Sequence, residues 1–138
     1  MGNTGSIERI SFEDVQYCIR HGWTIINTLP DDKQGVLIKG TIPASREVEF
    51  ITNLISKKEH TRTNVVIYGE NSSCEKLEKK ALDLVKHGFA RVYIYVGGLF
   101  EWMLLRDVYG EEDFPITQDE LDILKFKPKN RILTYMLE

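Results

Sequence analysis

Segments with strand character alternate with segments of helical periodicity along most of this chain, and this alternation limits the possible fold more than any other feature. Apolar segments with the length and composition of buried strands lie at residues 7–10, 23–29, 65–68 and 91–96. Apolar residues at helical spacing lie between and after them, at about residues 11–20, 45–57, 74–87 and 99–108. Such alternation is typical of a mainly parallel sheet with helices on both faces. We therefore predict a three-layer α/β fold.

The length of 138 residues is enough for one compact domain and too short for two ordinary ones. Acidic and basic residues nearly balance, with a formal net charge of −3, and the basic residues are scattered rather than clustered. This distribution argues against nucleic acid as a partner. No apolar run is long enough to span a membrane, and the polar start lacks the apolar centre of a secretory signal, so we expect a cytoplasmic protein.

The metal-binding and redox-active residue types are few. The two cysteines, Cys18 and Cys74, are too few for a disulfide framework or a thiolate metal site. The three histidines occur singly, without the spacing of a metal site. We therefore predict no metal and no cofactor. Cys18 shares the apolar face of the first expected helix, so we interpret it as a core residue.

The first residues contain one specific pattern. Gly2 followed by Ser6 fits the sequence that N-myristoyl transferases recognise. A polar leader without function is the alternative interpretation. If Gly2 is acylated, a single chain of this kind gives only reversible membrane association.

The segment after the apolar run at 65–68 is the strongest candidate for a ligand site. Ligands of parallel sheets bind at the carboxyl ends of the strands, beside the next helix. The small and polar residues at this place are Gly69, Glu70, Asn71, Ser72 and Ser73. A capping-box pattern of Ser72 with Glu75 predicts a helix start that puts Cys74 in the first helical turn, where the helix dipole favours a thiolate.

The last part of the chain has two weaker signals. Thr117 and Glu120 form another capping-box pattern, which predicts a short helix to about Phe126. Residues 131–136 have strand composition and would either add to the sheet edge or extend as a tail.

Two stretches resemble the rhodanese family. Gly88-Phe89 followed by residues 92–102, with the double glycine Gly97-Gly98 and Trp102, is similar to that family's glycine-phenylalanine, strand, double-glycine and tryptophan pattern. Residues 25–29 and 39–43 are a weaker match to its early strand and glycine-containing loop. The resemblance implies a rhodanese-like domain at 7–108 and leaves a C-terminal extension at 109–138 that packs on the domain or trails from it. We expect the polar residues 1–6 to form a flexible leader.

The sequence departs from the family pattern at the positions that carry its chemistry. The resemblance places a cysteine nucleophile directly after the central strand, where this chain has Gly69. The arginine that closes the family's active-site loop has no counterpart between Gly69 and Glu75. Asn27 and Leu29 stand where the family usually has an aspartate and an arginine.

These departures favour a non-catalytic binding or regulatory domain. Its partner would be a protein or a small anion bound by the backbone N–H groups of the Gly69–Ser73 loop. The alternative is a sulfurtransferase or thiol-redox enzyme that uses Cys74 as the persulfide carrier, although Glu75 lies beside this cysteine and the nearest lysines lie on the helix that follows.

Overall fold

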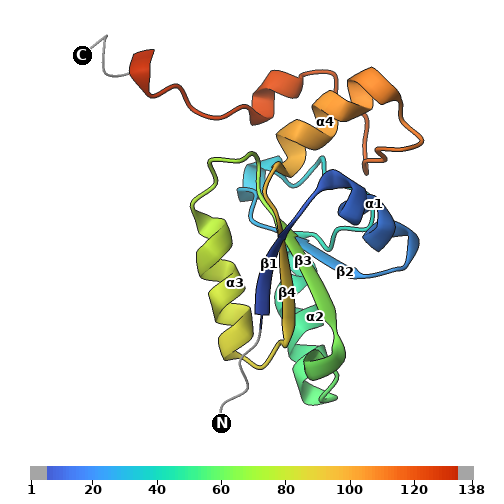
Figure 1. Ribbon diagram of the computed structural model, residues 1–138, viewed down its shortest axis with the longest axis vertical. Helices are drawn as coiled ribbons and strands as arrows, with labels where there is room; N and C mark the ends of the chain where they lie inside the picture. Colours follow the sequence, from blue (N-terminus) through green and yellow to red (C-terminus); the bar gives the residue numbers. More distant parts are fainter. Residues whose placement is uncertain (1–5, 134–138) are drawn as a thin grey trace.

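The computed structural model describes residues 6–133 and contains one four-stranded parallel sheet with helices on both faces (Figure 1). The strands are β1 (Ser6–Ile10), β2 (Thr24–Asn27), β3 (Asn64–Tyr68) and β4 (Arg91–Tyr95), in the order β1-β4-β3-β2. The helices are α1 (Phe12–Arg20), α2 (Ala44–Ser56), α3 (Lys76–Lys86) and α4 (Gly98–Tyr109). The predicted three-layer α/β fold is confirmed. Gly2, the residue of the acylation pattern, lies outside the described residues.

The two faces of the sheet carry separate cores because side chains alternate along each strand. On one face, Ile67 and Ile94 pack with Leu77, Ala81 and Leu84 of α3. On the other face, Val66, Tyr68 and Tyr95 pack with helices α1 and α4, including the buried Trp102. The apolar runs in the sequence are therefore strands covered by helices on both sides.

The predicted starts of α1 and α4 agree with the structure. Ser11 caps α1 in a capping box with Asp14, in which each side chain accepts from the backbone N–H of the other. Gly98 begins α4 with φ of +70°, and a Cβ at this position would lie 2.7 Å from the carbonyl oxygen of Gly69. The second glycine of the double-glycine pattern thus lets α4 approach the segment that follows β3.

The C-terminal extension differs from the expected helix and strand. Thr117 does not cap a helix, because its hydroxyl accepts from the N–H of Leu37 and its own N–H donates to the carbonyl of Leu37. The expected helix is instead a short 3-10 helix at Ile123–Phe126. Residues 131–133, the described part of the second signal, form no strand, and residues 134–136 lie outside the described part of the chain.

Two aromatic residues attach this extension to the domain. Phe114 and Phe126 are buried in the core that also holds Trp102. Figure 1 shows the extension running from the end of α4 back over the carboxyl edge of the sheet. The extension therefore reaches the edge at which ligands of parallel sheets bind.

None of the helices within residues 6–133 is both long and apolar enough to cross a membrane.

Candidate functional site

The segment after β3 is held closely by neighbouring elements. The carbonyl oxygen of Gly69 accepts from the N–H of Leu99 at 3.0 Å, and that of Glu70 accepts from the N–H of Phe100 at 2.8 Å. The buried side chain of Asn71 donates to the carbonyl oxygen of Phe126 at 2.9 Å. Gly69 and Asn71 are buried, while Ser72 and Ser73 are exposed. Of the five predicted loop residues, the two serines therefore face solvent, and the inner residues join the loop to α4 and the extension.

The start of α3 corrects the position predicted for Cys74. The helix begins at Lys76, and no side chain, including that of Ser72, caps its N-terminus. The reason is a turn in which the N–H of Ser73 donates to the side-chain oxygen of Asn71, and the N–H of Cys74 donates to the backbone carbonyl of Asn71. Cys74 therefore precedes the helix and does not lie in its first turn.

The thiol of Cys74 fills the space that a side chain at position 69 would take. A Cβ added to Gly69 would lie 2.6 Å from Sγ of Cys74 and 2.9 Å from Oγ1 of Thr28. The Cys74 thiol itself lies 3.3 Å from the hydroxyl of Thr28, which follows β2. The chain thus brings a thiol back to the end of β3, from a residue five positions further along the sequence.

A pocket of about 450 Å³ opens beside this thiol. Its lining joins the ends of β2 and β3 to the start of α3 and to the C-terminal extension. The lining residues are Thr28, Pro30, Lys33, Glu70, Asn71, Ser73, Cys74, Glu75, Lys76, Lys127, Lys129 and Arg131. We call this the thiol pocket. It contains five basic and two acidic side chains, a formal excess of three positive charges in a chain whose net charge is −3.

The C-terminal extension supplies most of this charge. Lys127, Lys129 and Arg131 alternate along the chain, and all line the thiol pocket. They follow Phe126, whose side chain is completely buried and whose carbonyl binds Asn71. A buried anchor therefore holds the start of the cationic segment against the loop after β3.

Two of the cations are paired with the acidic residues of the pocket. Lys33 binds Glu70 at 2.7 Å and also donates to the carbonyl of Lys125. Arg131 lies 3.6 Å from Glu75, and both of these side chains are largely exposed. Within residues 6–133, no ion pair involves Lys76, Lys127 or Lys129. These three ammonium groups account for the excess positive charge.

Several of these residues were not predicted as site residues. Thr28, Lys33 and Lys76 carry no pattern that distinguishes them in the sequence. The alternation of basic residues at 127, 129 and 131 is visible there, but its position over the pocket depends on the burial of Phe126. The buried Asn27, at a departure from the family pattern, has a structural role, since its side-chain oxygen accepts from the N–H of Leu29 and from Gln34.

No group of three or more His, Cys, Asp or Glu residues within the described range is arranged to hold a metal ion. The chemistry that the site residues offer is that of a partly buried thiol beside a hydroxyl and several ammonium groups. Such a pocket can attract an anionic group, and its thiol can act as a nucleophile if it loses its proton.

Comparisons with known proteins agree with this architecture. Residues 20–105 match the family described as rhodanese-like domain. This match covers more than half of the chain, so the protein belongs to the rhodanese-like domain family. No curated protein matches the chain.

Solved structures show the same fold at low identity. The wild-type structure of EanB superposes with a TM-score of 0.57 at 18% identity, over 86% of this chain and 29% of EanB. A full-length protein from Lactobacillus plantarum gives 0.56 at 19% identity, over 80% of this chain and 88% of that protein. Ygr203w is described as a yeast protein tyrosine phosphatase of the rhodanese family. It superposes with a TM-score of 0.50 at 15% identity, over 85% of this chain and 94% of Ygr203w. The chain spans less than a third of EanB, so it corresponds to one part of that protein.

Proposed function

We propose that this protein is a non-catalytic member of the rhodanese-like family that binds an anionic group in the thiol pocket. The observation that carries this proposal is the cationic segment over the pocket, from outside the family match, together with a glycine where the resemblance places the family's nucleophile. Gly69 offers no nucleophile, while Lys127 and Lys129 of this segment, together with Lys76, give the pocket its excess of positive charge. The anionic group would belong to a small molecule or to a protein partner.

The exposed part of the loop supports the same proposal. Ser73 lines the pocket, and its hydroxyl can donate to an anion. The carbonyl groups of Gly69 and Glu70 are already bonded to α4, so they do not direct negative charge into the pocket. Because the cations are exposed, their attraction for an anion should weaken as salt screens it.

Calorimetric titration of the protein with phosphate and with thiosulfate at low ionic strength tests this proposal. The variant Lys127→Gln/Lys129→Gln/Arg131→Gln should bind either anion about tenfold more weakly than the wild type. A control variant, Lys39→Gln/Lys57→Gln/Lys86→Gln, removes the same charge from residues that do not line the pocket, and it should bind almost normally. Equal weakening of anion binding in both variants would show that net charge alone causes the effect, and it would refute a specific site.

The position of the Cys74 thiol favours a second candidate function, which is sulfur transfer. Its Sγ lies 2.6 Å from the place of a Cβ at residue 69, so the thiol stands close to where the family's nucleophile would be. One structure of EanB is described as a complex with ergothioneine covalently linked with a persulfide. In this alternative, the Cys74 thiolate attacks the outer sulfur of thiosulfate, sulfite leaves, and a persulfide forms. Cyanide then removes the outer sulfur as thiocyanate and regenerates the thiolate.

A thiosulfate-to-cyanide assay separates the two candidates. The non-catalytic proposal predicts no thiocyanate above background for the wild type or for Cys74→Ser, and no added sulfur on Cys74 by mass spectrometry. Turnover that disappears in Cys74→Ser, with a persulfide on Cys74, would establish the enzyme and refute the non-catalytic proposal. Cys18→Ala serves as the control for loss of the other thiol.

Acylation of Gly2 is a separate proposal, because it concerns attachment and not the pocket. It rests on the Gly2 and Ser6 pattern alone. Mass spectrometry of the protein from cells that contain an N-myristoyl transferase tests it. A mass increase of one myristoyl group that is lost in Gly2→Ala supports it, and an unmodified Gly2 refutes it.

A further inference from the structure

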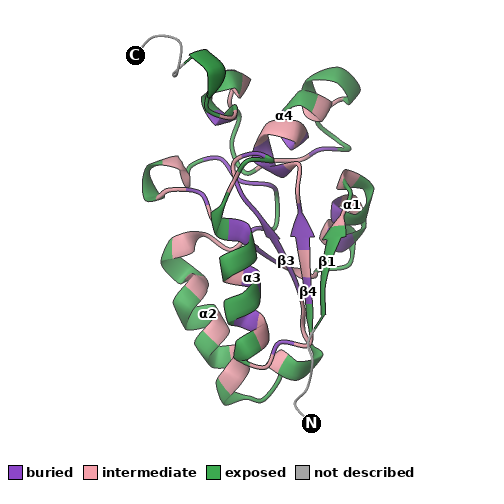
Figure 2. Ribbon diagram, turned by 60° about the vertical axis from the view of Figure 1, so that its left-hand side comes forward, coloured by how far each residue is buried: buried purple, intermediate pink, exposed green. Residues whose placement is uncertain are grey.

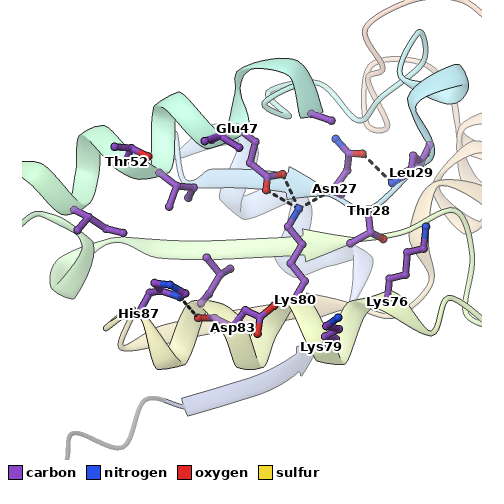
Figure 3. Close-up of a pocket in the computed structure, with 15 residues that line it drawn as sticks. Asn27, Thr28, Leu29, Glu47, Thr52, Lys76, Lys79, Lys80, Asp83 and His87 are labelled. Carbon is purple, nitrogen blue, oxygen red and sulfur yellow. Dashed lines mark hydrogen bonds and ion pairs between the residues drawn. The ribbon is translucent and has the colours of Figure 1, made fainter.

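Helices α2 and α3 lie on the same face of the sheet with an open groove between them (Figure 3). The groove has a volume of about 740 Å³. It is lined along its length by one face of each helix. From α2 come Ala44, Glu47, Val48, Ile51, Thr52 and Ile55. From α3 come Lys76, Lys79, Lys80, Asp83, Leu84 and His87, where His87 directly follows the helix.

Helix α2 has no completely covered apolar face. It is amphipathic, yet none of its 13 residues is buried, and Figure 2 shows it without the colour of buried residues. Ile51 and Ile55 are only partly buried, and the side chain of Val48 is 75% exposed. A surface helix of a globular domain normally buries its apolar stripe. The apolar wall of the groove is therefore available to another element.

A polar bridge crosses the groove near the carboxyl end of β2. Figure 3 shows Lys80 extending from α3 toward Glu47 and the backbone of Asn27. The ammonium group lies 2.6 Å from the Glu47 carboxylate and 3.3 Å from the carbonyl oxygen of Asn27. This ion pair neutralises the charges of Lys80 and Glu47 within the domain. It leaves an apolar section formed by Val48, Ile51, Ile55 and Leu84.

The remaining charges on the α3 side of the groove are distributed unevenly along the helix. Lys76 and Lys79 lie at the start of α3 and take part in no ion pair within residues 6–133. Asp83 lies one to two turns further along the same face. A ligand with apolar groups for the middle of the groove and carboxylates near Lys76 and Lys79 would be complementary to this surface.

We infer that this groove binds an acidic amphipathic helix of a partner protein. A helix suits the groove because both walls are helix faces that run side by side, and the groove is open along one side. Residues 44 to 55 of α2 span about 16 Å, which is the length of three helical turns. Apolar side chains of the partner at helical spacing would fill the section between Val48 and Leu84, in the helix-in-groove mode of recognition. This inference does not depend on anion binding in the thiol pocket.

A pair of labelled peptides tests the inference by fluorescence polarisation. The probe is a helical peptide of about 15 residues, with leucines along one face and glutamates beside them. The second peptide has lysines in place of the glutamates. Wild-type protein should bind the acidic peptide, and the basic peptide at least about fivefold more weakly.

Matched variants locate the binding. Val48→Asp should weaken binding of the acidic peptide about tenfold, because it puts a carboxylate against the leucine face. Val108→Asp, at a residue of α4 that is 70% exposed, is the control and should have no effect. Lys79→Glu should weaken binding of the acidic peptide and strengthen binding of the basic peptide. Lys86→Glu, at a residue outside the groove, should change the binding of neither peptide. Thermal melting establishes that each variant is folded.

Four results would overturn the inference. They are no binding of the acidic peptide to the wild type, equal binding of both peptides, equal binding to Val48→Asp and wild type, and a dimer in sedimentation that Val48→Asp dissociates. The last would show that a second copy of this chain occupies the groove. The thiosulfate and phosphate titrations remain independent of all four results, so failure here leaves the anion proposal unaffected.

Discussion

The Cys74 thiol lies 2.6 Å from the position that a Cβ on Gly69 would occupy, so the two residues share one side-chain space. Either a side chain at position 69 or the side chain of Cys74 can fill this space, but not both. The absence of a side chain at position 69 therefore leaves the space that the Cys74 thiol fills.

This relationship predicts a strong coupling between the two residues. Gly69→Ala should lower the free energy of unfolding by about 1–3 kcal/mol, because the methyl group would overlap Cys74. The same change should cost less in a Cys74→Gly background, where both atoms of the Cys74 side chain are gone and only the 2.9 Å approach to the Thr28 hydroxyl remains. Denaturant unfolding of the four proteins of this cycle measures the coupling. An equal cost in both backgrounds would contradict the shared space.

The anchor of the C-terminal extension gives a second prediction. Phe126→Ala should lower the free energy of unfolding by about 3–5 kcal/mol, because Phe126 is completely buried. It should also weaken phosphate binding, since the cations at 127, 129 and 131 lose their anchor. Leu124→Ala lies in the same 3-10 helix at a residue that is 62% exposed, and it should change stability by less than about 0.5 kcal/mol. An unchanged phosphate affinity in folded Phe126→Ala would show that the anchored extension does not contribute to anion binding in the thiol pocket.

Cys18 provides a prediction about alkaline pH. Burial, with a smaller contribution from the nearby Asp14 carboxylate, raises the pKa of the Cys18 thiol from 9.0 to about 11. The unfolded chain therefore releases the thiol proton at a lower pH than the folded protein does. The stabilisation that this shift represents is complete below about pH 9 and is lost as the pH rises through about 11.

The comparison of wild type with Cys18→Ala measures this loss. The stability difference between the two proteins should decrease by up to about 2 kcal/mol from pH 8 to pH 11 in denaturant titrations. Burial also raises the pKa values of Tyr68 and Tyr95, but both tyrosines are present in both proteins, so their contribution cancels. A difference that stays constant with pH would show that Cys18 does not titrate differently in the folded state.

The sequence predicts the frame of this fold well because its signals are local. The apolar run at 65–68 and the helical spacing of apolar residues at about 11–20 depend on neighbouring residues, and both agree with the structure. The capping box at Ser72 does not form because residues 71–74 make a turn, in which the N–H groups of Ser73 and Cys74 donate to Asn71, and the helix begins only at Lys76. Thr117 fails as a cap for a similar reason, since its hydroxyl is bonded to Leu37.

The candidate site was harder to predict because it is assembled from distant segments. The contact between Cys74 and the space at Gly69 depends on how the chain turns between them, which no pattern of residue types encodes. The cations at 127, 129 and 131 reach the pocket because Phe126 is buried against the core on the α4 side of the sheet. The sequence indicates Cys74 and the loop as candidates, but it does not reveal the partners that give the pocket its charge.

The most direct test of anion binding at the thiol pocket is a titration of isotopically labelled protein with phosphate, followed by amide chemical shifts. We predict saturable shifts concentrated at Thr28, Ser73, Cys74 and residues 127–131, with little change along α2. Shifts that are absent, or that concentrate on a surface away from the thiol pocket, would contradict the account.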